Sequence, residues 1–247
     1  MLLREVAAAS KSGASLQQLV TATSMPKSSV HRYLEVLIQQ HFLERDATAA
    51  TYRLAAGFFT LASNESQLLV LRARPYLERL RDRFDETVNL ATLSGDSVVY
   101  LDIVESPQAV RLASRIGDRD MVHSTALGKA IAATLPDTDV QSLLQRSGMP
   151  RRTANTIISI PAFIKHLQLV RHHGFAVDDQ ENDIDGRCVA MAMTVPWGKY
   201  AISISGITSR FPMSKTIEAA RELRQAVSAL SDHSIPPVKP YLYPSGA

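Results

Sequence analysis

One stretch decides the fold: Met25-Pro26-Lys27-Ser28-Ser29-Val30-His31-Arg32-Tyr33-Leu34. Apolar residues recur in and after it at i, i+4, i+7 and i+8, which are Val30, Leu34, Leu37 and Ile38. That spacing predicts a helix with one buried stripe. The fixed φ of proline suits a first helical position, so we expect the helix to begin at Pro26. The N-terminal end then presents small, polar and basic side chains: Lys27, Ser28, Ser29, His31 and Arg32.

The flanking sequence predicts a second helix before this one and a hairpin after it. Ser15 can cap a helix with an apolar face, and residues 21–25 form a short connection to the next helix. Residues 42–45 and 51–54 flank a turn of small residues at 46–50, as in a two-stranded wing. Together these elements predict a winged helix-turn-helix.

A helix-turn-helix of this composition is suited to reading DNA. Small residues let the backbone approach the groove, and basic side chains pair with phosphates or base edges. Arg45 and Arg53 flank the predicted wing, where they can meet neighbouring phosphates. The alternative is a small helical domain with a solvated polar face, and the pattern alone leaves it open.

Composition sets limits on the class of protein. The chain has 247 residues, 45% of them hydrophobic, with a net charge of +3, as expected of a globular protein. It has no run of about 18 apolar residues, the length that a membrane-spanning helix requires. Arg4 and Glu5 interrupt the apolar run that a signal peptide requires. Cys188 is the only cysteine, so no internal disulfide is possible and we expect a cytoplasmic protein.

The rest of the chain predicts a connecting helix followed by a mixed domain. Residues 57–86 are predicted to be helical, broken only near Pro75, and to serve as linker and dimer contact. Five apolar strands are then expected, at Val88–Thr92, Val98–Val104, Val110–Ser114, Val189–Val195 and Tyr200–Ile204. Four helices are expected, at Thr125–Leu135, Asp137–Gln145, Pro161–His173 and Ser214–Ser231. Strands in hairpin-like pairs favour a largely antiparallel sheet in an α+β fold.

Four motifs in order make the chain resemble the IclR family of bacterial regulators. The first is residues 25–34 with the wing at 42–46 and 52–54. The others are His123–Ala130, residues 174–190 and residues 201–206. The resemblance covers the chain to about residue 231. It implies a winged helix-turn-helix, a linker helix and an effector-binding domain related to GAF/PAS-like α/β folds. It also implies dimers, or dimers of dimers, on palindromic operators.

The resemblance assigns the domains and a ligand pocket. We expect a DNA-binding domain at 1–56, a linker helix at 57–86, an effector-binding domain at 87–232 and an extended or disordered proline-rich tail at 233–247. Free amides where a strand meets the helix at 124–129 would favour an anion, so we expect a small organic acid, with no cofactor and no metal. The implied effector residues are Ser124, Thr125, Ala126, Leu127, Asp178, Cys188, Ser203 and Ser205. Four apolar neighbours, Leu101, Val104, Leu112 and Met191, would complete a mostly apolar pocket.

Each of these residues also has a simpler explanation. Ser203 and Ser205 alternate with isoleucines and can be a solvent-facing strand surface, and a lone cysteine is often a core residue. The acidic residues from Asp178 to Asp185 can form a solvated loop, or a cation site with His123.

Three functions remain open at this point. The favoured one is a ligand-responsive transcriptional regulator, repressor or activator, of a catabolic or metabolic operon. The second is a DNA-binding dimer whose C-terminal domain only oligomerises. The remote third is an enzyme with Cys188 as nucleophile, His123 or His172 as base and Asp178 as orienting group.

The sequence departs from common family patterns in three places. Leu127 stands where smaller residues often admit a compact ligand, and Gly186 replaces what is often a bulkier residue. These changes reshape the pocket, so the effector is left unnamed. Leu2, Leu3 and Val6 recur at helical spacing and predict a first helix, so the chain begins almost at this helix, without the leader common in the family. This leaves open whether Met1 is the true start.

Overall fold

The computed structural model describes residues 2–9, 13–46, 50–55 and 64–231. Contacts divide the chain into two compact units, Met1–Gln67 and Leu68–Ala247, and each is described by itself. The start of the predicted linker helix at 57–63 and the tail at 233–247 lie outside the described residues. Among the helices in the described ranges, none is long and apolar enough to cross a membrane.

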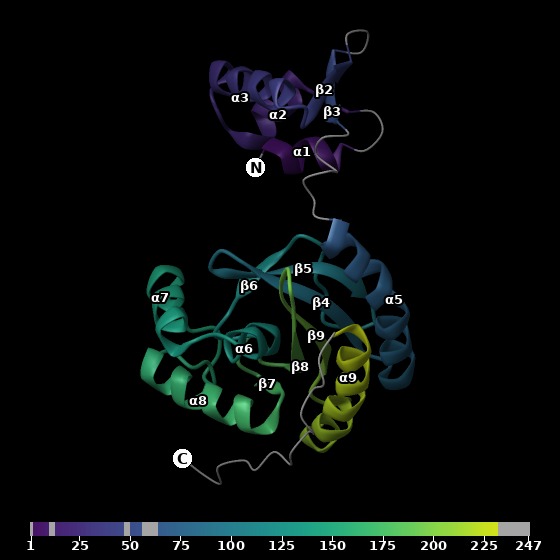
Figure 1. The fold of residues 1–247 in the computed structure, drawn as a ribbon, viewed down its shortest axis with the longest axis vertical. Coiled ribbons are helices and arrows are strands. Elements are labelled where there is room, and N and C mark those ends of the chain that lie inside the picture. The colour runs from purple at the N-terminus through teal and green to yellow at the C-terminus, as the bar shows by residue number, and fades with distance from the viewer. Residues whose placement is uncertain (1, 10–12, 47–49, 56–63, 232–247) are drawn as a thin grey trace. The chain divides into compact units, whose positions relative to one another are not determined.

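The first unit is a winged helix-turn-helix (Figure 1). Its helices are α1 (Leu2–Ala8), α2 (Leu16–Thr23) and α3 (Lys27–Gln39). Its antiparallel strands are β1 (Ala14–Ser15), β2 (Leu43–Asp46) and β3 (Thr51–Leu54), in the order β1-β3-β2. The wing is therefore a three-stranded sheet, because the two-residue strand β1, too short for an alternation pattern to reveal, pairs with β3.

Caps mark both ends of α2 and the start of α3. Ser15 caps α2 as predicted, and it does so in a capping box with Gln18. Ser24 ends α2 in the left-handed region at φ 54°. Pro26 is the cap of α3 and not its first residue; its carbonyl accepts from the amides of Ser29 (2.9 Å) and Val30 (3.0 Å). The helix therefore begins one residue later than expected.

Helix α5 (Asn64–Phe84) continues through Pro75, so the break expected there is wrong. Proline removes one helical hydrogen bond and crowds the preceding turn. Here Pro75 is exposed, while Leu69 and Ala73 before it and Leu77 and Leu80 after it are buried in one core. Burial on both sides of Pro75 stabilises a continuous helix across it.

The second unit contains one six-stranded antiparallel sheet in the order β6-β5-β4-β9-β8-β7. Its strands are β4 (Thr87–Ser94), β5 (Ser97–Val104), β6 (Arg119–Met121), β7 (Ala176–Asp179), β8 (Gly186–Val195) and β9 (Gly198–Ile207). The strand expected at Val110–Ser114 is absent, because Val110, Arg111 and Ala113 are exposed and the edge of β5 pairs with β6 instead. Strands β6 and β7 were not expected.

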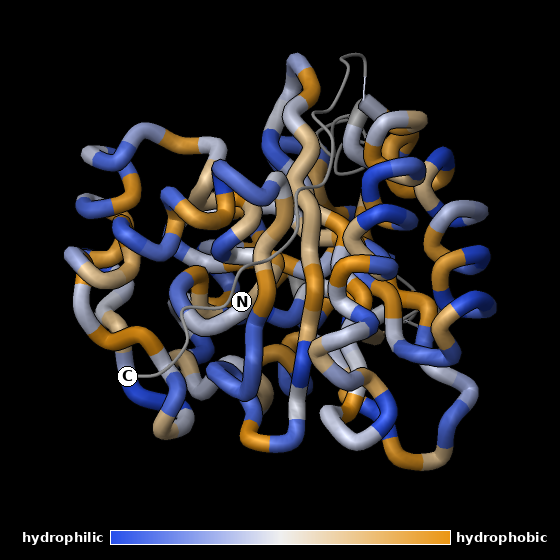
Figure 2. Tube along the Cα trace, turned by 90° about the horizontal axis from the view of Figure 1, so that it is seen from below, coloured by the Kyte–Doolittle hydropathy of each residue, from blue (hydrophilic) through white to orange (hydrophobic). Residues whose placement is uncertain are grey.

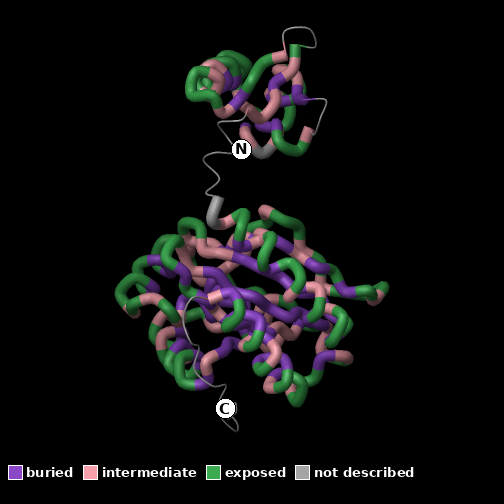
Figure 3. The backbone as a smooth tube through the Cα atoms, turned by 45° about the vertical axis from the view of Figure 1, so that its right-hand side comes forward, coloured by how far each residue is buried: buried purple, intermediate pink, exposed green. Residues whose placement is uncertain are grey.

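Helices cover both faces of this sheet (Figure 1). Helices α5 and α9 (Thr216–Leu230) pack on one face, and α6 (Ala126–Ala132), α7 (Asp137–Ser147) and α8 (Ile160–His173) lie on the other. In Figure 2 the helices show both hydrophobic and hydrophilic stretches, as expected of helices that bury one side. Figure 3 shows the buried segments running through the middle of the unit. The four predicted helices are present, although α6 ends at Ala132 and α9 is preceded by a 3₁₀ turn at Met213–Lys215.

Candidate functional site

The exposed face of α3 carries the side chains that the sequence assigns to DNA. Lys27, Ser28, His31 and Arg32 are exposed and Ser29 is half-buried, whereas Val30 and Leu34 are fully buried. The guanidinium of Arg32 lies over the Tyr33 ring, 5.5 Å from its centroid. Tyr33 (44% exposed) and Val36 (50% exposed) extend this face, and the sequence did not single them out.

The two arginines of the wing differ in their surroundings. Arg45 is exposed, with its guanidinium 5.9 Å from the centroid of the Tyr52 ring. Arg53 is half-buried and forms an ion pair with Asp46. Arg45 is therefore the more available of the two for a phosphate, because the charge of Arg53 is already partly neutralised.

In the second unit a cavity of about 490 Å³ lies on the face of the sheet that α6 covers. Every strand of the sheet contributes at least one lining side chain. Read from β6 to β7, these are Asp120 (β6), Tyr100 (β5), Asn89 (β4), Ser203 and Ser205 (β9), Cys188 (β8) and Asp178 (β7). The remaining walls come from the start of α6 and from coils: Arg111–Ser114, Asp118, Thr125–Leu127, Arg152, Asn182 and Asp183. Arg119 of β6 and Gly186 at the start of β8 complete them. Most lining residues are polar or charged.

Strand register explains why these side chains meet. Asp178 is directly opposite Cys188, and Cys188 is directly opposite Ser205, so the three form a row across β7, β8 and β9. In the next row Ser203 is opposite Asn89. Because strand side chains alternate between faces, the intervening valines and isoleucines point to the opposite core, beside α5 and α9.

Asn89 organises the floor of the cavity. Its Nδ2 donates to the Oγ of Ser203 (3.1 Å) and to the Oγ of Ser205 (3.2 Å). Its side-chain oxygen Oδ1 has no hydrogen-bond partner among the described residues, although Asn89 is only 3% exposed. Ser203 and Ser205 are also buried, so the solvent-facing strand weighed from the sequence is wrong. A buried acceptor without a partner is rare in proteins.

Asp178 lies beside this floor and its carboxyl is strongly perturbed. Burial raises the pKa of Asp178 to about 7, against the opposing charge of Lys129. Its Oδ1 accepts from the backbone amides of Glu181 (2.8 Å) and Asn182 (3.3 Å). Burial and the neighbouring Asp178 raise the pKa of the Cys188 thiol well above its usual range, which disfavours the thiolate that a nucleophile requires.

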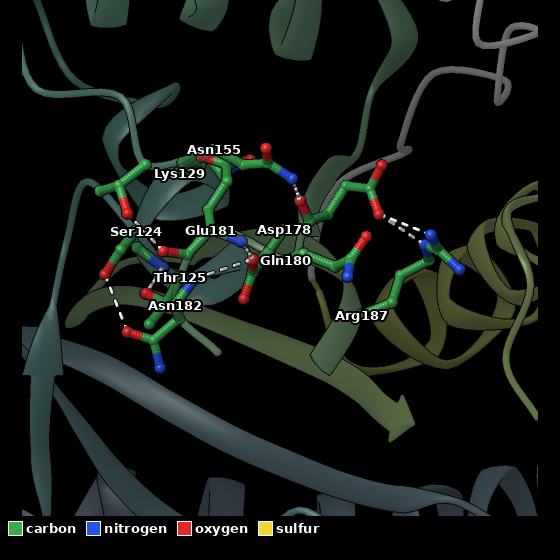
Figure 4. A network of polar contacts seen from close by, with 12 residues as sticks. Ser124, Thr125, Lys129, Asn155, Asp178, Gln180, Glu181, Asn182 and Arg187 are labelled. Carbon is green, nitrogen blue, oxygen red and sulfur yellow. Dashed lines mark hydrogen bonds and ion pairs between the residues drawn. The ribbon is translucent and has the colours of Figure 1, made fainter. Parts of the chain in front are cut away.

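A buried polar network holds the loop that follows Asp178 (Figure 4). Lys129, fully buried on α6, forms an ion pair with Glu181. Ser124 donates to the side-chain oxygen of Asn182 at 2.9 Å. Because Asp178 and Glu181 are buried, the solvated acidic loop considered from the sequence is wrong at these two positions. Within the described ranges, no cluster of three or more His, Cys, Asp or Glu residues is placed to hold a metal ion.

The structure brings together most of the residues assigned to the pocket, with corrections. Seven of the eight line the cavity, while Ser124 lies behind it, bonded to Asn182. Three of the four apolar neighbours, Leu101, Val104 and Met191, belong to the core on the other face of the sheet, and only Leu112 lines the cavity. The expectation of a mostly apolar pocket is therefore wrong.

The expected free amides at the start of α6 are also partly occupied. The Gly128 amide donates to the Thr125 hydroxyl (3.1 Å), and the Lys129 amide donates to the Thr125 carbonyl (3.0 Å). Gly128 is required here for a different reason, because a Cβ would lie 2.4 Å from the carbonyl oxygen of Val122. The glycine lets α6 approach the backbone that precedes it.

The sequence reading missed Asn89, Tyr100 and Arg152, among other lining residues. Asn89 was detectable as the one strongly polar residue in the expected strand Val88–Thr92. Tyr100 alternates with the apolar residues of its strand in the same way. Arg152 lies in a coil, where no periodicity marks the direction of a side chain.

Comparison with known proteins decides the family. The model of the bacterial transcriptional regulator IclR C-terminal domain matches residues 62–232, and that of the IclR helix-turn-helix domain matches residues 2–47. The chain belongs to the IclR family. The HTH-type transcriptional regulator BhcR of Paracoccus denitrificans (strain Pd 1222) is 31% identical over 232 residues, covering 90% of this chain and 83% of BhcR.

Solved structures of IclR proteins share the fold. The crystal structure of the Thermotoga maritima IclR is 27% identical, covers 88% of this chain and 89% of that chain, and has a TM-score of 0.64. An IclR homologue from Microbacterium hydrocarbonoxydans, complexed with 4-hydroxybenzoate, is 20% identical, covers 94% and 98% of the two chains, and has a TM-score of 0.71. This IclR-family protein is thus a DNA-binding transcriptional regulator and not an enzyme, which removes the Cys188-dependent alternative.

Proposed function

We propose that this IclR-family protein is a ligand-responsive regulator of a catabolic or metabolic operon. A small organic acid, bound in the cavity of the second unit, changes how the first unit binds its operator. The cavity itself carries this proposal: all six strands line it, and most of its lining residues are polar or charged. Its volume lies within the range of about 300–1,000 Å³ common for ligand sites. The 4-hydroxybenzoate held by the Microbacterium homologue supports a small acid as the class of effector.

On the DNA side, the proposed contacts come from α3 and the wing. Arg32, with Ser28 beside it, reads base edges, while Lys27, Ser29, His31, Arg45 and Arg53 meet phosphates or adjacent bases. The protein acts as a homodimer or a dimer of dimers on a palindromic operator, so that two copies of α3 reach half-sites in successive major grooves.

On the effector side, the proposed residues are those that line the cavity floor and the start of α6: Thr125, Ala126, Leu127, Asp178, Cys188, Ser203 and Ser205, with Asn89 added. Ser124 supports them through Asn182. The two hydroxyls, the amide and the Asp178 carboxyl supply the polar contacts that orient a ligand.

A thermal-shift screen of the full-length protein against small organic acids tests the proposal. At saturation an effector should raise the unfolding temperature of the second unit, because a ligand that binds only the folded state stabilises it. The same compound should change operator affinity about 5- to 150-fold. A regulator whose second domain only oligomerises would show neither effect with any acid in the screen.

A further inference from the structure

The cavity has two chemically different ends, and this difference constrains its ligand. We propose that it binds a monocarboxylic acid with several hydroxyl groups in one orientation, with the hydroxyls against the strands and the carboxylate at Arg152. The inference rests on the proposed function, since it takes this cavity as the effector site. The inference goes beyond the proposed function by naming the class of acid and the residue that binds its carboxylate.

The floor offers a ligand both hydrogen-bond donors and acceptors. The oxygens of Ser203 and Ser205 accept from Asn89 Nδ2, which leaves their O–H groups able to donate, and the Asp178 carboxyl lies in the adjoining row. A ligand hydroxyl can donate to the Asp178 carboxyl and accept from Ser203 or Ser205. A ligand carboxylate placed there would set its oxygens against the Asp178 carboxyl. The floor therefore selects hydroxyl groups.

The walls favour further hydroxyls and disfavour a second negative charge. Asp118, Asp120 and Asp183 also line the cavity. Asp120 accepts from the Tyr100 hydroxyl at 2.8 Å, and the three carboxylates together offer further acceptors along the walls. A ligand with hydroxyls at several carbons satisfies these acceptors, whereas a dicarboxylate would meet like charges on both sides.

Of the three arginines that line the cavity, Arg152 is the one free to take a carboxylate. Arg111 is paired with Glu105 at 2.7 Å, and the Arg119 guanidinium donates to the Ser94 carbonyl at 2.5 Å. The Arg152 guanidinium forms no hydrogen bond or ion pair with any described residue, and Arg152 is an exposed residue of the cavity lining. A guanidinium pairs with a carboxylate through two parallel hydrogen bonds, which fixes direction as well as charge.

The segment that carries Arg152 is tied to the floor. Thr153 Oγ1 donates to the Gln180 carbonyl at 2.6 Å, and Thr156 Oγ1 donates to the Glu181 carbonyl at 2.7 Å. The backbone amides of Glu181 and Asn182 in turn donate to the Asp178 carboxyl, which holds the loop at 180–182. The backbone position of Arg152 relative to the floor is therefore set by the fold, so the two ends select a ligand with matching groups at both ends.

Isothermal titration of the full-length protein with three six-carbon probes tests the orientation. D-gluconate has a carboxylate and hydroxyls, D-glucitol has hydroxyls only, and hexanoate has a carboxylate only. Gluconate should bind at least 10-fold more tightly than either of the others. Arg152→Gln should weaken gluconate about 10- to 100-fold and leave glucitol unchanged. Arg151→Gln is the matched control, because the adjacent Arg151 does not line the cavity and donates to the Ala154 carbonyl instead.

Any one of three results would overturn the inference. Hexanoate could bind as tightly as gluconate, Arg152→Gln could leave gluconate affinity unchanged, or none of the three probes could bind. Its failure can be told apart from failure of the proposed function. If an acid without hydroxyls binds the cavity and alters operator affinity, the proposed function stands and the orientation is wrong. If gluconate binds as described and operator affinity never changes, the orientation stands and the regulatory role is wrong.

Discussion

Replacing Glu181 by glutamine tests the part of the second unit that supports the cavity. The side chains of the Lys129–Glu181 ion pair are 0% and 8% exposed, so Glu181→Gln leaves an ammonium group buried without its counter-charge. Breaking a buried pair in this way costs about 3–5 kcal/mol. For a domain of this size each kcal/mol lowers the unfolding temperature by about 2–4 °C, so we expect a fall of about 6–20 °C.

The assay uses a feature of the chain itself. Trp197 is the only tryptophan and lies between β8 and β9, so its fluorescence reports unfolding of the second unit alone. Glu218→Gln is the matched control, because it makes the same chemical change in an exposed pair with Arg83 (53% and 49% exposed). That change should cost at most about 0.5–1 kcal/mol.

A double-mutant cycle identifies the cause of the loss. Removing both charges with Lys129→Met and Glu181→Gln should cost at least about 2 kcal/mol less than the sum of the single changes, because each single variant keeps an unpaired buried charge and the double variant does not. Additive losses, or a Glu181→Gln protein as stable as Glu218→Gln, would refute the claim that this pair holds the loop behind the cavity.

Three further predictions test other parts of the structure. Arg32→Ala should weaken operator binding by about 1–3 kcal/mol in a fluorescence-anisotropy titration; affinity equal to wild type would remove Arg32 from the interface. Gly128→Ala should destabilise the second unit by more than about 1 kcal/mol in urea unfolding, because its Cβ would meet the Val122 backbone; unchanged stability would show that α6 can move away. The raised pKa of Asp178 means that the folded state binds its proton more tightly than the unfolded state, so stability from this group is full below about pH 4 and is lost as the pH rises through about 7. Asp178→Asn should therefore flatten the fall in unfolding temperature between pH 4 and pH 8; an unaltered slope would contradict the assignment to Asp178.

The sequence predicted those elements in which periodicity and burial agree. The α3 stripe and the hairpin at 42–54 follow spacing rules, and both are present in the structure. Val110–Ser114 has the apolar character of a strand but lies exposed beside the cavity, so local pattern was misleading there. Pro75 shows the same limit, since packing on both sides of it overrides a local breaker.

The candidate site was predictable in its strands and not in its coils. Ser203 and Ser205 alternate with isoleucines, and the strand pairing places Cys188 and Asp178 on the same face as Ser205. Which core the apolar residues join depends on strand register, and for that reason Leu101, Val104 and Met191 were misplaced. Tertiary hydrogen bonds of Thr153 and Thr156 hold the coil that carries Arg152 beside the cavity. No pattern in a single sequence predicts such bonds.

The central claim is that occupancy of the cavity changes DNA binding, and one linkage measurement tests it most directly. Operator affinity is measured for the wild type and for Asp178→Ala, each with and without a saturating acid that stabilises the Trp197-reported transition. We predict a 5- to 150-fold change for the wild type. Asp178→Ala should bind the operator normally without the acid and show a blunted response to it. Equal wild-type operator affinity with and without the bound acid would contradict the account.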